Sequence, residues 1–401
     1  MKKILIFSHA MEIGGAERAL IGLLETIDTT KYQVDLFLMR HEGELMKYIP
    51  EGIRLLPESK LYSCLAVPFV KVLKEGCLGV AVGRFVGKRK AAQRVEELGL
   101  AGENDVALEY SHKYTLPFLP MVSGENYDLA ISFLTPHYYV SEKVQAKQKI
   151  AWIHTDYSIV ATDRESQVKM WDAYDCIASI SDHVTKSFLN TFPELEKKIL
   201  LLPNIMPMRY LDSMTKAFSP ELEMPLDGSI RLLSVGRFCR AKNFDNIPHI
   251  CRRLREMGLN VKWYIIGFGG DESLIRQKIK EAGMENAVII LGKKENPYPY
   301  IAACDLYVQP SRYEGKCVSV IEAQILHKPV VITNYATSGS QLRDGYDGII
   351  VPMDNEGCAE GIAMVLRDRE LQQRLIENTR KNDYTNSGEI EKLYRILEQS
   401  T

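Results

Sequence analysis

The stretch RLLSVGRFCRAKNFDNIPHICRRLREMGLNVKWYIIG, residues 231–267, contains the unit from which the fold is built. An apolar run from Arg231 to Val235 is followed by a segment, Asn243 to Met257, in which apolar residues recur at helical spacing. A second apolar run follows from Val261 to Ile266. Strand, helix and strand in this order are typical of a parallel sheet covered by helices. The stretch therefore predicts an α/β fold with doubly wound parallel sheets.

Both halves of the chain show this alternation. In the second half, further strands are predicted at Ala287 to Leu291, Leu306 to Gln309, Pro329 to Thr333 and Gly348 to Val351. In the first half we expect a helix at Ala16 to Ile27 and strands at Lys3 to Ser8, Val34 to Met39, Tyr127 to Phe133, Lys149 to Ile153, Asp175 to Ile180 and Lys198 to Leu202. Two Rossmann-like domains result, and we expect the carboxyl ends of their strands to face each other across a cleft.

The domain boundaries follow from prolines and glycines. Three prolines and a glycine interrupt any periodic pattern between residues 206 and 229. We therefore predict an N-terminal, acceptor-binding Rossmann-like domain at 1–205, a linker region at 206–229 and a C-terminal, donor-binding Rossmann-like domain at 230–384. Residues 385–401 are expected to form a C-terminal helix that packs back on the N-terminal domain.

Composition limits the class of protein. A chain of 401 residues with 46% hydrophobic and 25% charged residues fits two globular domains. The net charge of -2 argues against nucleic acid as a partner. The eight cysteines lack C-x-x-C spacing, so the sequence predicts reduced, mostly buried thiols and indicates neither a zinc site nor a disulfide framework. Because the sequence contains no long apolar segment, we expect a cytoplasmic protein.

Gly14 and Gly15 follow the first predicted strand and open a helix. Glycines let the backbone approach a ligand, and the amides of a helix start can bind an anion or a sugar. An ordinary tight turn explains the pair equally well. The pattern is neither G-x-G-x-x-G nor a P-loop, which disfavours a dehydrogenase or a kinase.

Arg237 and Lys242 follow the first strand of the second domain. The planar guanidinium and the ammonium can both reach one diphosphate at a strand carboxyl end. Two solvated surface cations are the simpler interpretation of these residues taken alone.

A third group of residues extends from Ser311 to Glu322. Glu314 follows a strand, and Glu322 lies about two turns into the next helix. Two such carboxylates can accept hydrogen bonds from the diols of a sugar and of a ribose. Between them, a helix start around Gly315, Lys316, Cys317 and Val318 offers backbone donors to phosphates.

Taken together, these motifs resemble family 4 of the retaining glycosyltransferases, which have the GT-B fold. The matching pieces, in chain order, are Gly14 to Arg18, Trp152-Ile153-His154, Ser234 to Arg237 with Lys242, Ile265 to Gly269, and Glu314 through Glu322. They span most of the chain, and the block from Ser234 to Thr333 is the specific part. The chain departs from many members at Gly315-Lys316-Cys317, where a Phe or Pro is common, and this affects the expected donor sugar more than the reaction type.

The resemblance implies roles for individual residues. Arg237 and Lys242 would hold the donor diphosphate, Glu314 would contact the transferred sugar, and Glu322 would contact the ribose. His154 is similar in position to the active-site histidine of the family, although a lone histidine can also be structural. Gly15 would approach the donor. The expected reaction is retaining sugar transfer from a nucleotide diphosphate sugar, with UDP favoured, to a glycan or lipid-linked acceptor in cell-surface polysaccharide or glycoconjugate synthesis.

We expect no cofactor and no metal, because the sequence lacks an Asp-x-Asp motif and the phosphate charge can be matched by Arg237, Lys242 and helix starts. Two other functions remain open. One is a nucleotide-sugar epimerase of the same fold, and the other is a non-catalytic partner that binds a nucleotide sugar and assists another transferase.

Residues 68–95 carry seven cations and a single acid, interleaved with apolar residues. Such a basic amphipathic surface can rest on anionic lipid at the inner face of the membrane, with roughly 1 kcal/mol contributed per well-placed cation. Ordinary helices with one solvated face are an equally good interpretation of this segment.

Overall fold

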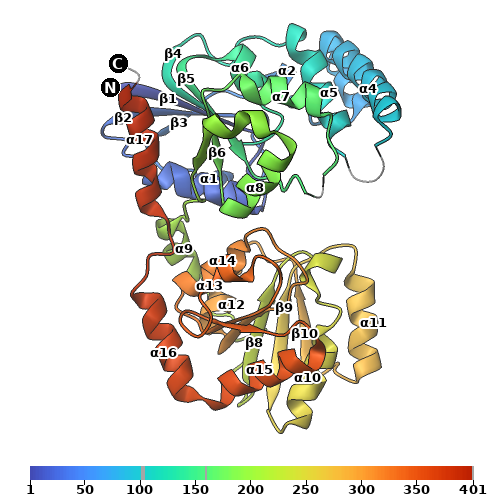
Figure 1. The fold of residues 1–401 in the computed structure, drawn as a ribbon, viewed down its shortest axis with the longest axis vertical. Helices are drawn as coiled ribbons and strands as arrows, with labels where there is room; N and C mark the ends of the chain where they lie inside the picture. The colour runs from blue at the N-terminus through green and yellow to red at the C-terminus, as the bar shows by residue number, and fades with distance from the viewer. Residues whose placement is uncertain (101–103, 159, 400–401) are drawn as a thin grey trace. The chain divides into compact units, whose positions relative to one another are not determined.

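The computed structural model describes residues 1–100, 104–158 and 160–399, so two positions of the predicted C-terminal helix, 400 and 401, lie outside the described residues. The chain divides into two compact units (Figure 1). The first unit comprises Met1–Pro207 together with Asn386–Thr401, and the second comprises Met208–Thr385.

The first unit contains a seven-stranded sheet with the order β3-β2-β1-β4-β5-β6-β7, in which every neighbouring pair is parallel. Its strands are β1 (Lys2–Ser8), β2 (Tyr32–Leu38), β3 (Ile53–Leu55), β4 (Asn126–Ser132), β5 (Gln145–Ile153), β6 (Cys176–Ser179) and β7 (Ile199–Leu201). Its helices are α1 (Gly15–Thr26), α2 (Lys60–Ser63), α3 (Phe69–Lys74), α4 (Leu78–Leu98), α5 (Val106–Thr115), α6 (Tyr138–Lys143), α7 (Arg164–Asp172), α8 (Asp182–Thr191) and α17 (Ile390–Gln399), with 3-10 turns η1 (Met46–Tyr48), η2 (Leu116–Phe118) and η3 (Pro193–Lys198).

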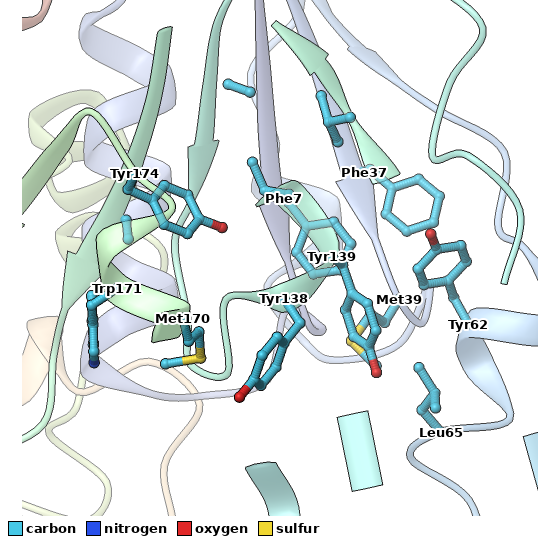
Figure 2. Packing of buried hydrophobic residues seen from close by; sticks show 14 of the residues in the cluster. Phe7, Phe37, Met39, Tyr62, Leu65, Tyr138, Tyr139, Met170, Trp171 and Tyr174 are labelled. Atoms are coloured by element: carbon cyan, nitrogen blue, oxygen red, sulfur yellow. The ribbon is translucent and has the colours of Figure 1, made fainter. Parts of the chain in front are cut away.

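The core of the first unit is rich in aromatic rings (Figure 2). Phe7 of β1 stacks on Phe37 of β2 with ring centroids 5.4 Å apart, and Tyr62 of α2 meets Phe37 edge-on at 5.1 Å. Helix α17 packs on the same unit, since Tyr394 stacks on Tyr32 at 4.8 Å. The first unit therefore combines residues from both ends of the chain.

The second unit contains a six-stranded parallel sheet with the order β10-β9-β8-β11-β12-β13. Its strands are β8 (Ile230–Val235), β9 (Val261–Ile266), β10 (Val288–Gly292), β11 (Leu306–Gln309), β12 (Val330–Thr333) and β13 (Ile349–Val351). Its helices are α9 (Met208–Thr215), α10 (Ile247–Glu256), α11 (Glu272–Ala282), α12 (Tyr298–Ala303), α13 (Val318–Ile325), α14 (Ser338–Gln341), α15 (Asn355–Arg367) and α16 (Arg369–Arg380), with the 3-10 turn η4 (Arg240–Lys242). The turn η5 (Ser387–Glu389) belongs to the first unit.

The observed strands lie where the apolar runs predicted them, but three features differ from the sequence interpretation. Strand β3 was not predicted, because three residues of moderate burial carry little periodic signal. Helix α10 begins four residues later than expected, since Asn243 has a left-handed φ of 60° and ends the turn η4. Helix α9 lies within the predicted linker and buries Tyr210, Leu211 and Met214.

Both sheets reverse their strand order beside their first strand. In the first unit β1 is flanked by β2 and β4, and in the second β8 is flanked by β9 and β11. Ligands of open α/β sheets bind at the carboxyl ends of the strands beside such a switch point. The residues that follow β1, β8 and β11 are therefore the first to consider as functional.

Candidate functional site

The loops after β8 and β11 are fastened to each other. The Arg312 amide donates to the Ala241 carbonyl at 2.7 Å, and the Arg312 guanidinium binds both carboxylate oxygens of Asp245 at 2.9 and 2.8 Å. Ser319 of α13 also donates to the Val235 carbonyl at 3.1 Å. These contacts hold the predicted phosphate-binding and sugar-binding residues on one rigid support.

Lys242 and Glu314 meet at the switch point. The Lys242 Nζ donates to Glu314 Oε1 at 2.5 Å, and Ser311 Oγ donates to the same oxygen at 2.6 Å. Burial alone would lower the pKa of Lys242, but neighbouring Cys317 and Glu314 raise it above its ordinary value. A permanently charged ammonium therefore lies beside the predicted sugar ligand, and the structure brings together two residues that are 72 positions apart.

Some of the hydrogen-bond donors at the start of α13 already have partners within the protein. The Cys317 amide, which we expected to face a phosphate, donates to Gln341 Oε1 at 2.7 Å. Lys316 Nζ donates to the Ser340 carbonyl at 2.8 Å. The Cys317 thiol accepts from Lys242 at 3.6 Å, and burial raises its pKa. Val318 is the first residue of α13, and Gly315 has open space around its Cα.

Glu322 lies inside α13 and is fully buried. The Tyr298 hydroxyl donates to Glu322 Oε1 at 2.8 Å. This tyrosine fixes the orientation of the carboxylate and partly compensates the cost of burying it. The sequence did not single out Tyr298, although its position at the start of α12, which packs on α13, makes it a supporting residue for the predicted ribose contact.

Arg237 is exposed and lies in the loop between β8 and η4. This loop packs tightly on the glycine loop after β9, because the Phe238 amide donates to the Phe268 carbonyl at 2.8 Å. A Cβ on Gly267 would lie 1.9 Å from the Gly236 carbonyl oxygen, and one on Gly269 would lie 2.3 Å from that of Phe238. Both glycines also have a φ of 154°, which other residues rarely adopt. The close backbone approach and this conformation together explain why the motif requires glycine here.

In the first unit, His154 directly follows β5. Its ring lies 4.7 Å from Phe133 and stacks nearly parallel to Trp152 at 6.3 Å. Burial lowers the pKa of His154 to about 3, so the imidazole is neutral at physiological pH. Its Nε2 has no hydrogen-bond partner within the described part of the chain.

His154 is one of several side chains at this end of the sheet with unsatisfied buried atoms. Among the described residues, others include Ser8 Oγ, His9 Nε2, His112 Nδ1, His137 Nε2 and Trp152 Nε1. Burial lowers the pKa of His9 to about 4 and places those of His112 and His137 well below the ordinary value. Sequence reasoning missed His9, although it directly follows β1, and missed His137 because it lies beyond the end of β4 with no recognisable motif.

The glycine pair after β1 begins α1 as predicted. Gly14 is the N-cap with an extended φ of -150°, which any residue can adopt. A Cβ on Gly14 would lie 2.0 Å from Glu17 Oε2, so the Glu17 carboxylate folds over this helix start. Burial raises the pKa of Glu17. The contact explains Gly14 without a ligand, whereas Gly15 is exposed.

Residues 223–382 match the family described as Glycosyl transferases group 1. A relative from Campylobacter jejuni is 31% identical over 376 residues, which cover 93% of this chain and 92% of the relative. The chain belongs to the group 1 glycosyl transferases. That relative is named N-acetylgalactosamine-N,N'-diacetylbacillosaminyl-diphospho-undecaprenol 4-alpha-N-acetylgalactosaminyltransferase. The lipopolysaccharide core biosynthesis glycosyltransferase LpsE of Rhizobium meliloti is 28% identical over 158 residues, covering 39% of this chain and 45% of its own.

Solved structures place this glycosyltransferase in the GT-B fold. HepE of Anabaena, crystallised with UDP, superposes with a TM-score of 0.64 at 15% identity over all of both chains. Starch synthase IV of Arabidopsis thaliana, bound to ADP and acarbose, superposes with a TM-score of 0.69 at 14% identity over 100% of this chain and 99% of its own. The predicted fold class, glycosyltransferase activity and family resemblance are confirmed at this level. In the part of the chain that the structure describes, no helix is long and apolar enough to cross a membrane.

Proposed function

We propose that this glycosyltransferase is a retaining, metal-independent enzyme that moves a sugar from UDP-sugar to a lipid-linked glycan acceptor. One observation carries the proposal. A buried lysine is paired with a glutamate at the switch point of the second unit, next to the exposed Arg237, which is where a diphosphate and its sugar would need a cation and a hydrogen-bond acceptor.

The donor would bind along the loops after β8 and β11. The Lys242 ammonium has three N–H donors, of which Glu314 and Cys317 take two, so the third is available for a phosphate oxygen. Arg237 would add a forked contact to the diphosphate. Glu314 would orient the sugar, and the preoriented Glu322 carboxylate would accept from the ribose hydroxyls. The UDP complex of the structural neighbour HepE supports this choice of nucleotide.

In the reaction, the bond between the anomeric carbon and the phosphate oxygen breaks while the acceptor oxygen bonds to the same face of the sugar. The acceptor proton passes to the departing phosphate oxygen, and Arg237 and Lys242 stabilise the negative charge that develops there. Positive charge develops on the sugar at the same time. A neutral His154, whose pKa is lowered to about 3 by burial, would not repel that charge as an imidazolium would.

The acceptor would bind to the first unit. The unpartnered imidazole, hydroxyl and indole atoms at the carboxyl edge of its sheet can hydrogen-bond to glycan hydroxyls, which both donate and accept. The name of the Campylobacter jejuni relative contains diphospho-undecaprenol, a lipid carrier. A lipid-linked glycan in cell-surface polysaccharide or glycoconjugate synthesis is therefore the acceptor class that we propose.

The surface of α3 and α4 supports delivery of such an acceptor from a membrane. Helix α4 packs on α5 through small residues: a Cβ on Gly83 would lie 2.7 Å from the Tyr114 carbonyl oxygen, and one on Gly87 would lie 2.6 Å from that of Tyr110. Many of the large apolar residues of α3 and α4 are exposed, among them Phe69, Val70, Leu73, Leu78, Val82, Phe85 and Val86.

Five of the seven cations of residues 68–95 are exposed as well, namely Lys71, Lys74, Lys88, Arg89 and Lys90. The other two face the protein, since Arg84 donates to the Cys64 carbonyl at 2.9 Å and Arg94 pairs with Asp163 at 2.8 Å. Exposed apolar and cationic side chains on the same helices fit an anionic lipid surface at the inner face of the membrane.

Labelled UDP-sugars incubated with and without an undecaprenyl diphosphate-linked glycan test the main proposal. We expect acceptor-dependent product with an α-configured linkage from an α-configured donor, read by NMR. Inversion would overturn the retaining mechanism. Conversion of the donor sugar without acceptor would indicate an epimerase, and nucleotide binding without turnover for any donor would indicate a non-catalytic partner.

Metal independence has its own test. We expect turnover to survive excess EDTA, because the cations that face the diphosphate are side chains. Turnover that is lost on chelation and restored by Mg²⁺ or Mn²⁺ would contradict this prediction.

A further inference from the structure

The connection between α2 and α4 brings two cysteines and a glutamate together in the first unit. Cys64 follows α2, Glu75 follows α3 and Cys77 precedes α4. The two Sγ atoms lie 3.0 Å apart, and Glu75 Oε2 lies 3.7 Å from Cys64 Sγ. One ligand atom from each of the three residues lies within 4.8 Å of the other two. This cluster takes no part in the transferase chemistry proposed above.

A helix cap fixes two of the three side chains. The Cys77 amide donates to the Val72 carbonyl at 3.1 Å and the Gly76 amide to the Leu73 carbonyl at 3.0 Å, which together form a Schellman motif. Gly76 has the left-handed φ of 73° that this motif requires. Val72 and Cys77 are both buried, as is usual for the first and last residues of such a cap. The backbone thus presents Glu75 and Cys77 toward Cys64.

We propose that Cys64, Glu75 and Cys77 bind a zinc ion. Thiolates and a carboxylate are ligands that zinc accepts, and thiolates exclude magnesium and calcium, which prefer oxygen. On binding, the two thiols lose their protons to water, and two Zn–S bonds and one Zn–O bond form without any change in oxidation state. A simple disulfide would make no use of the glutamate.

The surroundings can compensate the charge of the loaded site. Zinc with two thiolates and one carboxylate carries one net negative charge. Arg84 Nη1 donates to the carbonyls of Cys64 and Val67 at 2.9 and 2.6 Å, which places its guanidinium next to the cluster. Lys71 Nζ lies 3.9 Å from Glu75 Oε1. Two cations therefore border a group of potential anions.

Glu75 connects the buried cysteine pair to a pocket that opens to solvent. Glu75 lines an open pocket of about 260 Å³ together with Lys60, Ser63, Val67 and Lys71. Three protein ligands leave a fourth tetrahedral position, which water from this pocket can fill. A bound ion would join the ends of α2, α3 and α4 and so hold the exposed face of α3 and α4 in one orientation.

The full-length protein, reduced and stripped of metal, should bind one equivalent of Zn²⁺ in competition with a chromophoric chelator. With Co²⁺ as a probe it should develop thiolate-to-metal charge-transfer absorption. The double variant C64S/C77S should lose both signals, and Glu75→Gln should weaken binding by at least about tenfold. Cys176→Ser, a partly exposed cysteine on β6 of the same unit, should bind like the unchanged protein.

Because buried Cys→Ser changes can impair folding, Glu75→Gln and the cobalt spectrum of the unchanged protein serve as independent readouts. The proposal is overturned if the unchanged protein shows no thiolate-to-cobalt absorption, or if Glu75→Gln binds Zn²⁺ as tightly as the unchanged protein. It is also overturned if the protein, purified without reductant, contains a Cys64–Cys77 disulfide and binds no metal after reduction.

Discussion

The carboxyl edges of the two sheets differ in how their polar side chains are partnered. At the edge of the second sheet, polar groups are paired within the protein: Lys242 with Glu314, Arg312 with Asp245 and Tyr298 with Glu322. At the edge of the first sheet, buried polar atoms of Ser8, His9, His137, Trp152 and His154 have no hydrogen-bond partner within the described residues. The paired charges of the second edge suit an anionic ligand, whereas the neutral histidines of the first edge, with their unpartnered ring nitrogens, suit a ligand made of hydroxyl groups.

Among the substitutions that test this comparison, His154→Ala should reduce turnover most. Since the family resemblance implies an active-site role for this imidazole, we expect turnover to fall by on the order of 10² to 10³, as when one preorganised polar contact is removed from an active site. Steady-state kinetics measure the change, and circular dichroism checks the fold. His249→Ala on α10, a partly buried histidine away from this edge, is the control. A near-normal rate for His154→Ala would make this histidine structural.

Next in size are the two glutamates of the second edge. Glu314→Ala removes the partner of Lys242, and we expect transfer to fall by about 10²-fold while UDP still binds. Glu322→Ala should instead weaken UDP binding by about 10- to 100-fold, because hydrogen bonds to a charged group are worth about 1.5 to 3 kcal/mol.

Calorimetric titration with UDP separates these roles, and Tyr298→Phe provides a control that keeps the Glu322 carboxylate but removes the hydrogen bond from the Tyr298 hydroxyl. Equal losses of UDP affinity for Glu314→Ala and Glu322→Ala would show that the two roles are wrongly assigned.

As the pH falls, the first unit should lose stability before the second. Folding lowers the pKa of His154 to about 3 and of His9 to about 4, below the ordinary value of 6.5, so the unfolded chain binds more protons between those values. The stability that these groups provide is complete above pH 6.5 and is lost as the pH falls, by up to about 1.4 kcal/mol per pH unit for each histidine. Burial raises the pKa of Glu109 to about 6, so this carboxylate takes up a proton more readily in the folded than in the unfolded chain. Its contribution to stability therefore partly offsets that of one histidine as the pH falls.

Hydrogen exchange of the intact chain at pH 7 and pH 5 measures this difference. We expect amides of the first sheet to lose more protection than those of the second. The reverse order, or equal losses, would contradict the assignment of the buried neutral histidines as the acid-sensitive element.

The smallest effect concerns the surface of α3 and α4. Changing Lys88, Arg89 and Lys90 to Ser should weaken co-sedimentation with anionic vesicles by up to about 3 kcal/mol at low salt, at roughly 1 kcal/mol per cation. Added salt should weaken binding of the unchanged protein in the same direction. Changing Lys278, Lys280 and Arg276 on α11 gives a matched control in the second unit. If the unchanged protein stays in the supernatant at low salt, a soluble acceptor replaces the lipid-linked one.

Much of the fold could be predicted because buried parallel strands are continuous apolar runs. Every strand with such a run was found, and β3 was missed because only three residues mark it. The start of α10 was placed too early because nothing in the residue type reveals that Asn243 adopts a left-handed φ.

The candidate site was predictable only in part. Arg237, Lys242, Glu314 and Glu322 attract attention because charged residues follow apolar strands. Their pairing does not follow from the sequence, since Lys242 and Glu314 are far apart in the chain. The other buried histidines, His9, His112 and His137, were missed for another reason. A single histidine has no pattern, and only the folded sheet shows how many of them share one edge.

The order of the units along the chain also determines when each can be completed. The second unit is one continuous segment, Met208–Thr385, whereas the first needs Asn386–Thr401 to finish it. On the ribosome, the second unit is therefore complete while the first still lacks α17, whose Tyr394 stacks on Tyr32 and accepts a hydrogen bond from the Asp28 amide at 2.9 Å. The first unit is therefore completed last, so premature termination near residue 385 would leave a finished second unit attached to a first unit that lacks α17.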